Sequence, residues 1–311
     1  MNIPWIEKYR PNNLDEIVMN SILKKKLLNL KSLTSLPNLI LTGFSGTGKT
    51  TTLFCLAKDF LKDHNALLEL NASDNRGIET INNLVTHFCK KKINTNKKII
   101  IFDEADNITN KAQYILAELM DQYNYNTIFT FTCNDTSKII EPIQNKCLMY
   151  YFNNVSEENI IERIKYICKL ENITYTTDGL EALARISNGD IRYAINNLEA
   201  TYYCYNNITE SNVYQLCYQP NPKIIINIIN ACIAKNIVDA ISNYKRLKSE
   251  GYSNSDITQS ILNMCKTMKI NESVRLCIIK YTSDIYLLIV DGVNSELLMY
   301  SYFSKLILSL E

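Results

Sequence analysis

The sequence predicts an α/β domain built on a parallel sheet, followed by an all-α remainder. Two observations support this prediction. From Pro37 to about Phe152, short apolar runs rich in β-branched and aromatic residues alternate with stretches of helical periodicity. Nearly continuous runs of this kind are typical of strands that helices bury on both faces. After Asn153 the strand pattern stops and only helical patterns follow.

Five apolar runs are the predicted strands of the sheet. They lie at residues 38–42, 66–70, 98–102, 127–133 and 147–152. Between the first two, residues 51–63 are expected to form a helix, because apolar side chains recur there on one helical face: Leu53, Leu56, Ala57 and Phe60. This alternation predicts parallel strands joined by helical crossovers.

The helical remainder begins with three predicted helices. Ser156 is the expected N-cap of the first and Asp178 that of the second, while the third follows the sequence GDIR. The turn-rich sequence YQPNP at 218–222 separates them from a last helical part, whose breaks are expected near Lys235, Gly251, Asn271 and Gly292. The predicted domains are therefore 1–154, 155–219 and 220–311.

Composition excludes several classes of protein. The 311 residues carry a formal net charge of +1, so binding to a polyanion would need a local basic patch. The ten cysteines include no CxxC pair and only two histidines accompany them, which predicts free thiols in a reducing compartment. The N-terminus lacks the apolar core of a signal peptide, and charged or polar residues interrupt the most apolar segments. We expect a soluble intracellular protein with no membrane partner.

The most specific motif is GFSGTGKT, which fits the pattern G-x-x-x-x-G-K-[ST] between a predicted strand and a predicted helix. Its glycines let successive backbone N–H groups turn toward an anion at the helix N-terminus. Lys49 is expected to reach the β- and γ-phosphates of a nucleotide, and the Thr50 hydroxyl to ligate Mg²⁺. The expected phosphate cradle comprises Gly43, Phe44, Ser45, Gly46, Thr47, Gly48, Lys49 and Thr50.

Two carboxylates follow the third predicted strand. Asp103 and Glu104 end the run KIIIFDE and therefore lie at the carboxyl edge of the sheet, where ligands bind in such folds. Asp103 suits the acidic role linked to Mg²⁺, and Glu104 suits polarising an attacking water. Taken alone, an acidic strand end is more often a loop start or a helix cap. The phosphate loop upstream reverses that balance and favours nucleotide hydrolysis over phosphoryl transfer to a metabolite.

Two further polar residues are candidates for the same site. Asn134 follows the strand at 127–133, where its neutral amide can hydrogen-bond the γ-phosphate or the attacking water without repelling either. Arg192 lies in the first turns of a helix of the second predicted domain, from which it could reach back to the nucleotide. A turn-forming asparagine and a solvated helix arginine are the ordinary alternatives, and both stay open.

The order of these motifs resembles one family. PWIEKYRP, GFSGTGKT, ELNASDNRGI, FDEAD, TCND, SKIIEPIQNKC and GDIRYAIN follow one another as in the small subunits of replication factor C, which are AAA+ clamp loaders of eukaryotic and archaeal type. The resemblance covers roughly Met1 to Tyr218, and the remainder fits the family's collar by length and class. It implies a RecA-like AAA+ domain over 1–154, a three-helix lid over 155–219 and a helical collar over 220–311.

The resemblance also implies roles for single residues. In that family the N-terminal box lies over the adenine, which assigns this role to Trp5, Tyr9, Arg10 and Pro11. Asn134 and Arg192 correspond to the first and second sensors of the γ-phosphate. The box ELNASDNRGI leads into a helix that faces primer-template DNA, and the implied phosphate contacts are Arg76, Gly77, Ile78, Thr80, Ser137 and Lys138.

Two departures from the family pattern concern the neighbouring subunit. The family has Ser-Arg-Cys where this chain has Asn145-Lys146-Cys147, and that arginine normally completes a neighbour's ATP site. The chain also carries Ala117 and Glu118 where small subunits typically have two arginines. Lys146 therefore stands in the place of a trans-acting finger, and its contribution to the next subunit is in question.

The function implied by the resemblance is ATP-dependent clamp loading. The chain would be an ATPase that uses ATP and Mg²⁺ as one member of a hetero-pentamer with other clamp-loader subunits. The complex would open a sliding clamp and place it on primer-template DNA, in a nucleus or at a viral replication site. Two alternatives stay open: a structural ring subunit that binds ATP without hydrolysing it, and a hexameric AAA+ DNA helicase. The helicase would need a C-terminal winged-helix module, for which the helical pattern after Pro222 leaves little room.

Overall fold

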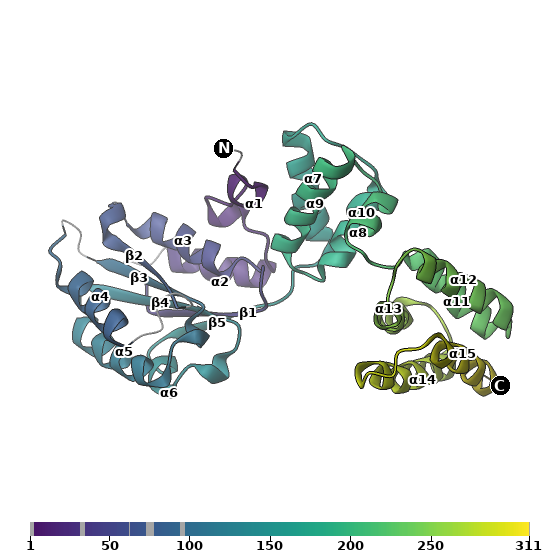
Figure 1. Cartoon of the computed structure of the whole chain (residues 1–311). Helices are drawn as coiled ribbons and strands as arrows, with labels where there is room; N and C mark the ends of the chain where they lie inside the picture. The colour runs from purple at the N-terminus through teal and green to yellow at the C-terminus, as the bar shows by residue number, and fades with distance from the viewer. Residues whose placement is uncertain (1–2, 32–34, 62, 73–77, 94–96, 311) are drawn as a thin grey trace. The chain divides into compact units, whose positions relative to one another are not determined.

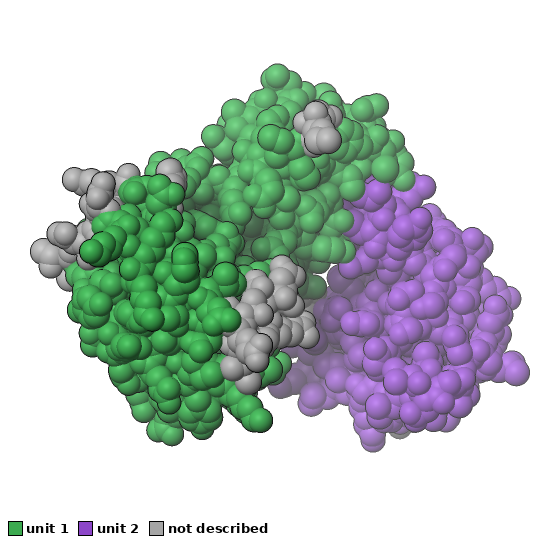
Figure 2. All heavy atoms as spheres, turned by 60° about the vertical axis from the view of Figure 1, so that its left-hand side comes forward, with its two compact units in different colours: residues 1–208 green, residues 209–311 purple. Residues whose placement is uncertain are grey.

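The computed structural model describes residues 3–31, 35–61, 63–72, 78–93 and 97–310 (Figure 1). They form two compact units, Met1–Ile208 and Thr209–Glu311 (Figure 2). The first unit contains a five-stranded sheet in the order β2-β3-β4-β1-β5, and every pairing in it is parallel. The strands are β1 (Leu39–Gly43), β2 (Leu67–Asn71), β3 (Lys98–Asp103), β4 (Thr127–Cys133) and β5 (Leu148–Phe152). The predicted fold class is confirmed, and each strand begins and ends within one residue of its predicted position.

Two helical layers cover the sheet (Figure 1). α2 (Ser21–Lys31) and α3 (Lys49–Phe60) lie on one face. α4 (Ile78–Lys90), α5 (Asn110–Tyr123) and the short α6 (Glu141–Gln144) lie on the other. Because side chains alternate along a strand, each central strand contributes apolar residues to both layers and is largely apolar, with buried threonines at 127, 130 and 132 of β4.

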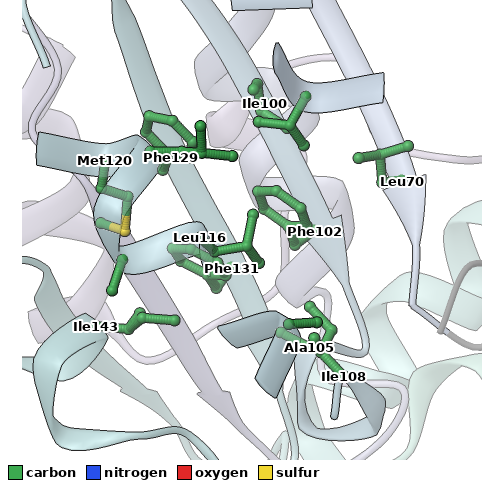
Figure 3. Close-up of a cluster of buried hydrophobic side chains, with 14 of the residues drawn as sticks. Leu70, Ile100, Phe102, Ala105, Ile108, Leu116, Met120, Phe129, Phe131 and Ile143 are labelled. Atoms are coloured by element: carbon green, nitrogen blue, oxygen red, sulfur yellow. The ribbon is translucent and has the colours of Figure 1, made fainter. Parts of the chain in front are cut away.

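The core beneath α5 is aromatic. Phe102 of β3 stacks on Phe131 of β4 with ring centroids 5.0 Å apart. Leu116 and Met120 of α5 pack against the same cluster (Figure 3). This packing holds β3 and β4 in place beneath α5. The polar residues of the candidate site follow at the carboxyl ends of these two strands.

A helical segment closes the first unit. It consists of α7 (Glu157–Leu170), α8 (Thr177–Ser187) and α9 (Ile191–Tyr205), with a parallel pair of two-residue strands, β6 (Thr174–Tyr175) and β7 (Asn207–Ile208). The expectation that strands stop after Asn153 was therefore wrong. Strands of two residues are too short to show a period-2 pattern, so periodicity could not reveal them.

The helix caps of this segment differ in part from those predicted. Ser156 occupies the N-cap position of α7, but its side chain makes no capping hydrogen bond. α8 is capped by Thr176, whose hydroxyl accepts the Gly179 N–H, and not by Asp178. Asp190 caps α9 by accepting the Tyr193 N–H at 2.9 Å, which places Arg192 in the first turn of that helix.

The second unit is helical in all its described elements. They are α10 (Glu210–Leu216), α11 (Pro222–Ile233), α12 (Ile237–Ser249), α13 (Asn254–Thr267), α14 (Glu272–Val290) and α15 (Glu296–Ser309). The breaks between the last five confirm those predicted. Their core is apolar and includes the fully buried rings of Tyr244, Tyr302 and Phe303.

None of the helices in the described ranges combines the length and the apolar character needed to cross a membrane. Within the same ranges, His, Cys, Asp and Glu side chains form no group of three or more suited to holding a metal ion. The cysteines are free thiols, and those at 55, 89, 133, 168, 232 and 265 are buried.

Candidate functional site

The loop between β1 and α3 is shaped by its glycines. Gly46 has φ of +66° and Gly48 has φ of +92°, in the left-handed region that a side chain disfavours. A Cβ on Gly46 would also lie 1.7 Å from Oδ1 of Asp190, the residue that caps α9. The Ile191 N–H donates to the Gly46 carbonyl at 3.3 Å. The loop therefore needs glycine both to turn and to let the start of α9 approach.

Lys49 is the first residue of α3 and is largely buried. Its Nζ donates to the carbonyls of Gly43 at 2.8 Å and Phe44 at 2.7 Å, and to Oδ1 of Asn134 at 3.0 Å. Burial lowers the pKa of the Lys49 ammonium, because the charged form loses its hydration. The structure thus brings together two residues that the sequence singled out independently, from the loop and from the end of β4.

The Thr50 hydroxyl meets the first of the two carboxylates. Its Oγ1 donates to Oδ1 of Asp103 at 2.7 Å, and Oγ1 of Thr132 donates to the same carboxylate oxygen. A hydroxyl and a carboxylate side by side form a hard-oxygen donor pair of the kind that Mg²⁺ prefers. Thr132 was missed by the sequence reasoning, since a threonine within an apolar strand is an ordinary β residue.

Glu104 adopts an unusual backbone conformation. It has φ of 53° and ψ of 45°, and its N–H donates to Oγ1 of Thr132 at 3.1 Å. A left-handed conformation at a residue other than glycine costs of the order of 1 kcal/mol and persists only where the surroundings impose it. Oε2 of Glu104 accepts the Asn107 side-chain amide at 3.3 Å. The strand end is thus fixed while the carboxylate stays exposed.

Asp106 is a second residue that the sequence reasoning missed. Its Oδ2 accepts the backbone N–H of Asn134 at 3.3 Å, while its Oδ1 is buried and has no hydrogen-bond partner in the described structure. It therefore connects the turn after Glu104 to the end of β4. The sequence signal was present in FDEAD, but nothing in its spacing distinguishes this carboxylate from a solvated one.

These residues surround one polar cavity. The loop from Ser45 to Thr51, the ends of β3 and β4, and Arg192 line it. Arg192 is exposed in the first turn of α9, and its charge contributes to lowering the Lys49 pKa. The structure thus places Lys49, Thr50, Asp103, Glu104, Asn134 and Arg192 around a single space.

A second cavity, which we name the apolar cavity because it is less polar than the first, also borders the loop. It is lined by the N-terminal residues Tyr9, Arg10 and Pro11, by Gly46, Thr47 and Gly48 of the loop, and by both Arg163 of α7 and Arg192 of α9. Glu7 and Thr51 also line it, together with five apolar side chains: Ile6, Ile17, Val18, Ile191 and Ile195. Arg163 and Val18 are lining residues that no sequence motif marked.

Trp5 is placed differently from the other residues of the N-terminal box. Its ring is buried, and its centroid lies 5.6 Å from that of Tyr202 and 6.1 Å from that of Tyr203, both in α9. It is absent from the lining of the apolar cavity. The sequence pattern could not separate a ring that packs under the box from one that faces the cavity.

The candidate DNA contacts are described only in part. Arg76 and Gly77 lie outside the described residues, and Ile78 and Thr80 lie in the first turn of α4 without described side chains. Ser137 and Lys138 lie in the 3-10 turn η4 (Thr136–Lys138) after β4, and both are exposed.

Lys146 is bonded to α5 of its own chain. Its Nζ donates to the Ala117 carbonyl at 2.8 Å and to Oδ2 of Asp121 at 2.7 Å. The ion pair is partly exposed, with 29% of the Lys146 side chain and 70% of the Asp121 side chain accessible. Pairs of this kind stabilise by less than about 1 kcal/mol, so the Lys146 side chain can leave this contact at little cost.

Comparisons with known proteins match the chain along nearly its whole length. Residues 39–154 match the ATPase family associated with various cellular activities (AAA), residues 162–203 the RCF1/5-like AAA+ ATPase lid domain, and residues 220–305 the replication factor C C-terminal domain. Among solved structures, Thermotoga maritima RuvB, a Holliday junction branch migration motor, has a TM-score of 0.58 at 17% identity over 71% of this chain and 79% of its own. That likeness shows the shared fold alone.

Several relatives are similar over nearly the full length of both chains. Replication factor C subunit 4 of Saccharomyces cerevisiae is 37% identical over 98% of this chain and 96% of its own. The replication factor C small subunit of Methanosphaera stadtmanae is 36% identical over 99% and 98%. A putative replication factor C small subunit of Acanthamoeba polyphaga mimivirus is 36% identical over 98% and 97%. The chain therefore belongs to the replication factor C small-subunit family of AAA+ ATPases.

Proposed function

We propose that this chain binds Mg²⁺–ATP and hydrolyses it as one subunit of a hetero-pentameric clamp loader, which places a sliding clamp on primer-template DNA. The observation that supports this most is the convergence of Lys49, the Thr50–Asp103 pair and Asn134 at one cavity. Family membership supplies the process in which such an ATPase acts. The eukaryotic and viral relatives suggest a nucleus or a viral replication site.

The residues present fit Mg²⁺–ATP. Bound Mg²⁺–ATP supplies the phosphoanhydride bond whose hydrolysis releases free energy. Lys49 offers its ammonium to the phosphates, in place of the carbonyls that it now contacts. Thr50 and Asp103 offer hard oxygen ligands, as Mg²⁺ requires. Gly46 and Gly48, with their left-handed φ values, allow the loop the turn by which backbone N–H groups can face an anion.

The hydrolytic roles follow from positions around the cavity. Glu104, exposed beside Asp103, is proposed to polarise an attacking water. Asn134 is proposed to hydrogen-bond the γ-phosphate or that water, and Asp106 accepts its backbone N–H. Arg192 is proposed to contact the γ-phosphate from the first turn of α9. On the base side, Tyr9, Arg10 and Pro11 are proposed to contact the adenine. Trp5 is proposed to support them from beneath.

Assembly with other subunits is supported by apolar residues of the second unit. Five leucines and one valine of its last two helices are exposed: Leu276, Leu287, Leu288, Val290, Leu297 and Leu308. Exposed apolar side chains that gather into a contiguous patch mark a surface that another protein covers, and we propose that these six contribute to such a patch. We assign this surface to neighbouring subunits of the ring.

DNA binding is proposed to involve Arg76, Gly77, Ile78 and Thr80, together with Ser137 and Lys138. Exposed donors near a helix start can hold phosphates without reading bases, so a chain of net charge +1 can still bind duplex DNA.

We expect Lys138→Ala, in the assembled loader with ATP, to weaken DNA binding about equally on different sequences. The slope of the logarithm of the binding constant against the logarithm of the salt concentration should decrease in magnitude by about one. Lys169→Ala, which removes an exposed lysine at the end of α7, is the matched control. A changed sequence preference at constant affinity would contradict this assignment.

Lys146 is expected to stimulate a neighbour's ATPase only weakly. Lysine lacks the planar fork with which arginine holds two γ-phosphate oxygens, and its Nζ is shared with Asp121 and the Ala117 carbonyl. In GTPases, an arginine finger raises the rate of nucleotide hydrolysis by ~10³–10⁵-fold. Lys146→Arg should therefore raise the DNA-stimulated ATPase rate of the assembled loader, while Lys146→Ala should lower it little.

Asp121→Asn is the companion variant for that experiment, since it weakens the contact on Lys146 without altering the lysine. A large loss of ATPase rate with both Lys146→Arg and Lys146→Ala would show that lysine itself is the adapted residue. The interpretation of a weakened finger would then be wrong.

A further inference from the structure

The N-terminal residues 4–12, which we name the strap, are bonded to α7 and α9 at one end. The Trp5 N–H donates to Oε2 of Glu199 in α9 at 2.9 Å, and the Trp5 ring packs against the two tyrosines of the same helix. Tyr9 donates its phenolic O–H to Oε1 of Glu171, directly after α7, and Lys8 donates to the same oxygen at 2.6 Å.

Arg163 adds a bond to the strap backbone. This α7 residue is partly buried, and its Nη2 donates to the Tyr9 carbonyl at 2.5 Å. Because this guanidinium donates to a backbone carbonyl, it fixes the position of the main chain at Tyr9 and does not depend on the identity of the side chain there. Arg163 and Glu171 thus hold Tyr9 from two sides, through its carbonyl and its hydroxyl.

The other end of the strap is bonded to α3, the helix that begins at the phosphate loop. The Pro11 carbonyl accepts the Cys55 thiol at 3.6 Å, and Oδ1 of Asn12 accepts Nζ of Lys58 at 3.0 Å. The Arg10 guanidinium lies 5.0 Å from the ring centroid of Phe54. The change of partner, from α7 and α9 to α3, falls between Tyr9 and Arg10.

This change of partner lies in the wall of the apolar cavity, which Tyr9, Arg10 and Pro11 line. A displacement of α7 and α9 relative to α3 must therefore alter that wall, because the two ends of the strap are held by different elements. Conversely, a base that fills the cavity would hold both ends in one arrangement.

We propose that Arg163 and Glu171 are positioning residues, which fix the strap to the helical segment 157–205 and so couple the grip on the nucleotide base to the position of that segment. The inference rests on the proposed function, since it takes the apolar cavity to be the base site. In this proposal Arg163 affects the nucleotide indirectly, through its bond to Tyr9. Glu171 also affects it through Tyr9, although Glu171 itself does not line the cavity.

Nucleotide affinities test this coupling. In the full chain, Arg163→Ala and Glu171→Ala are each expected to weaken ATP binding by about tenfold, because each removes a charge-assisted hydrogen bond that holds the strap in the arrangement lining the cavity. Binding of inorganic tripolyphosphate, which occupies the phosphate side alone, should be unchanged. Arg163→Lys and Glu171→Gln should restore part of the loss. Lys165→Ala, an exposed cation of the same helix, is the matched control.

The outcomes separate this inference from the proposed function. If the wild-type chain binds no ATP, the proposed function fails, and the inference with it. If the wild type binds ATP and both alanine variants bind it equally well, the inference alone fails. Equal losses for ATP and tripolyphosphate would also overturn it, because the effect would then reach the phosphate loop.

Trp5 provides a readout that does not depend on nucleotide binding. It is the chain's single tryptophan and is 4% exposed, so its fluorescence reports the docking of the strap. In the double variant Arg163→Ala, Glu171→Ala we expect emission at longer wavelength than in the wild type, as the indole gains contact with water. Weakened ATP binding with unchanged Trp5 emission would show that Arg163 acts by direct contact with the nucleotide, and the positioning role would be wrong.

Discussion

Glu104→Gln is expected to slow ATP hydrolysis in the assembled loader by ~10²–10⁴-fold while leaving ATP affinity nearly unchanged. The amide keeps the shape of the side chain but loses the negative charge that polarises water. The backbone of Glu104 is held by the Thr132 hydroxyl through its N–H, which the substitution does not touch. The position of the residue should therefore be conserved, and only the chemistry should change.

Single-turnover hydrolysis with bound ATP measures this effect without interference from product release. Glu181→Gln is the matched control, because it makes the same substitution at an exposed position of α8. A single-turnover rate equal to that of the wild type would contradict the role of Glu104. It would also favour the alternative that this chain is a structural subunit which binds ATP without turning it over.

Lys49→Ala is expected to weaken ATP binding by about 10²–10⁴-fold. Hydrogen bonds to charged groups contribute about 1.5–3 kcal/mol each, and the ammonium is positioned to reach two phosphates. In the apo protein the variant removes a buried cation whose pKa burial lowers, but it also takes a donor from the Gly43 and Phe44 carbonyls and from Oδ1 of Asn134. Equilibrium titration with a labelled nucleotide measures the affinity, and thermal unfolding checks the fold.

Lys25→Ala serves as the control for that titration, since it removes an exposed lysine from α2. Nucleotide affinity within twofold of the wild type in Lys49→Ala would mean that the loop is not the phosphate site. Reduced affinity together with a large loss of thermal stability would instead attribute the effect to misfolding, and Lys49→Met would then be compared.

The phosphate side of the site could be predicted from the sequence because its signals are local. The glycine loop lies between a predicted strand and a predicted helix, and the carboxylates lie at the end of a predicted strand. The flanking elements therefore indicate where each motif lies in the fold. The parallel sheet brings those positions to one edge, so Lys49 and Asn134, far apart in sequence, meet at 3.0 Å. The fold class together with these local signals was enough to expect both residues at one edge of the sheet.

The residues that sequence reasoning missed act through tertiary contacts. Thr132 is an ordinary strand residue until β3 is placed beside it, and Arg163 is an ordinary helix arginine until the strap crosses α7. The cap of α8 shows a different limit. Thr176 and Asp178 are both good N-cap residues two positions apart, and only the helix start decides between them. The role of Trp5 depended likewise on packing against α9.

The central claim is that nucleotide binding by this chain drives the loading of a ring-shaped clamp. The most direct test is the transfer of a labelled sliding clamp to primed circular DNA by the loader reconstituted with its partner subunits, measured as clamp that co-elutes with DNA in gel filtration. With ATP, the wild-type complex should leave the clamp on the circle, and without nucleotide the clamp should elute free. Clamp retention that is equal with and without ATP, or a complex that unwinds DNA as a hexamer and retains no clamp, would contradict the account.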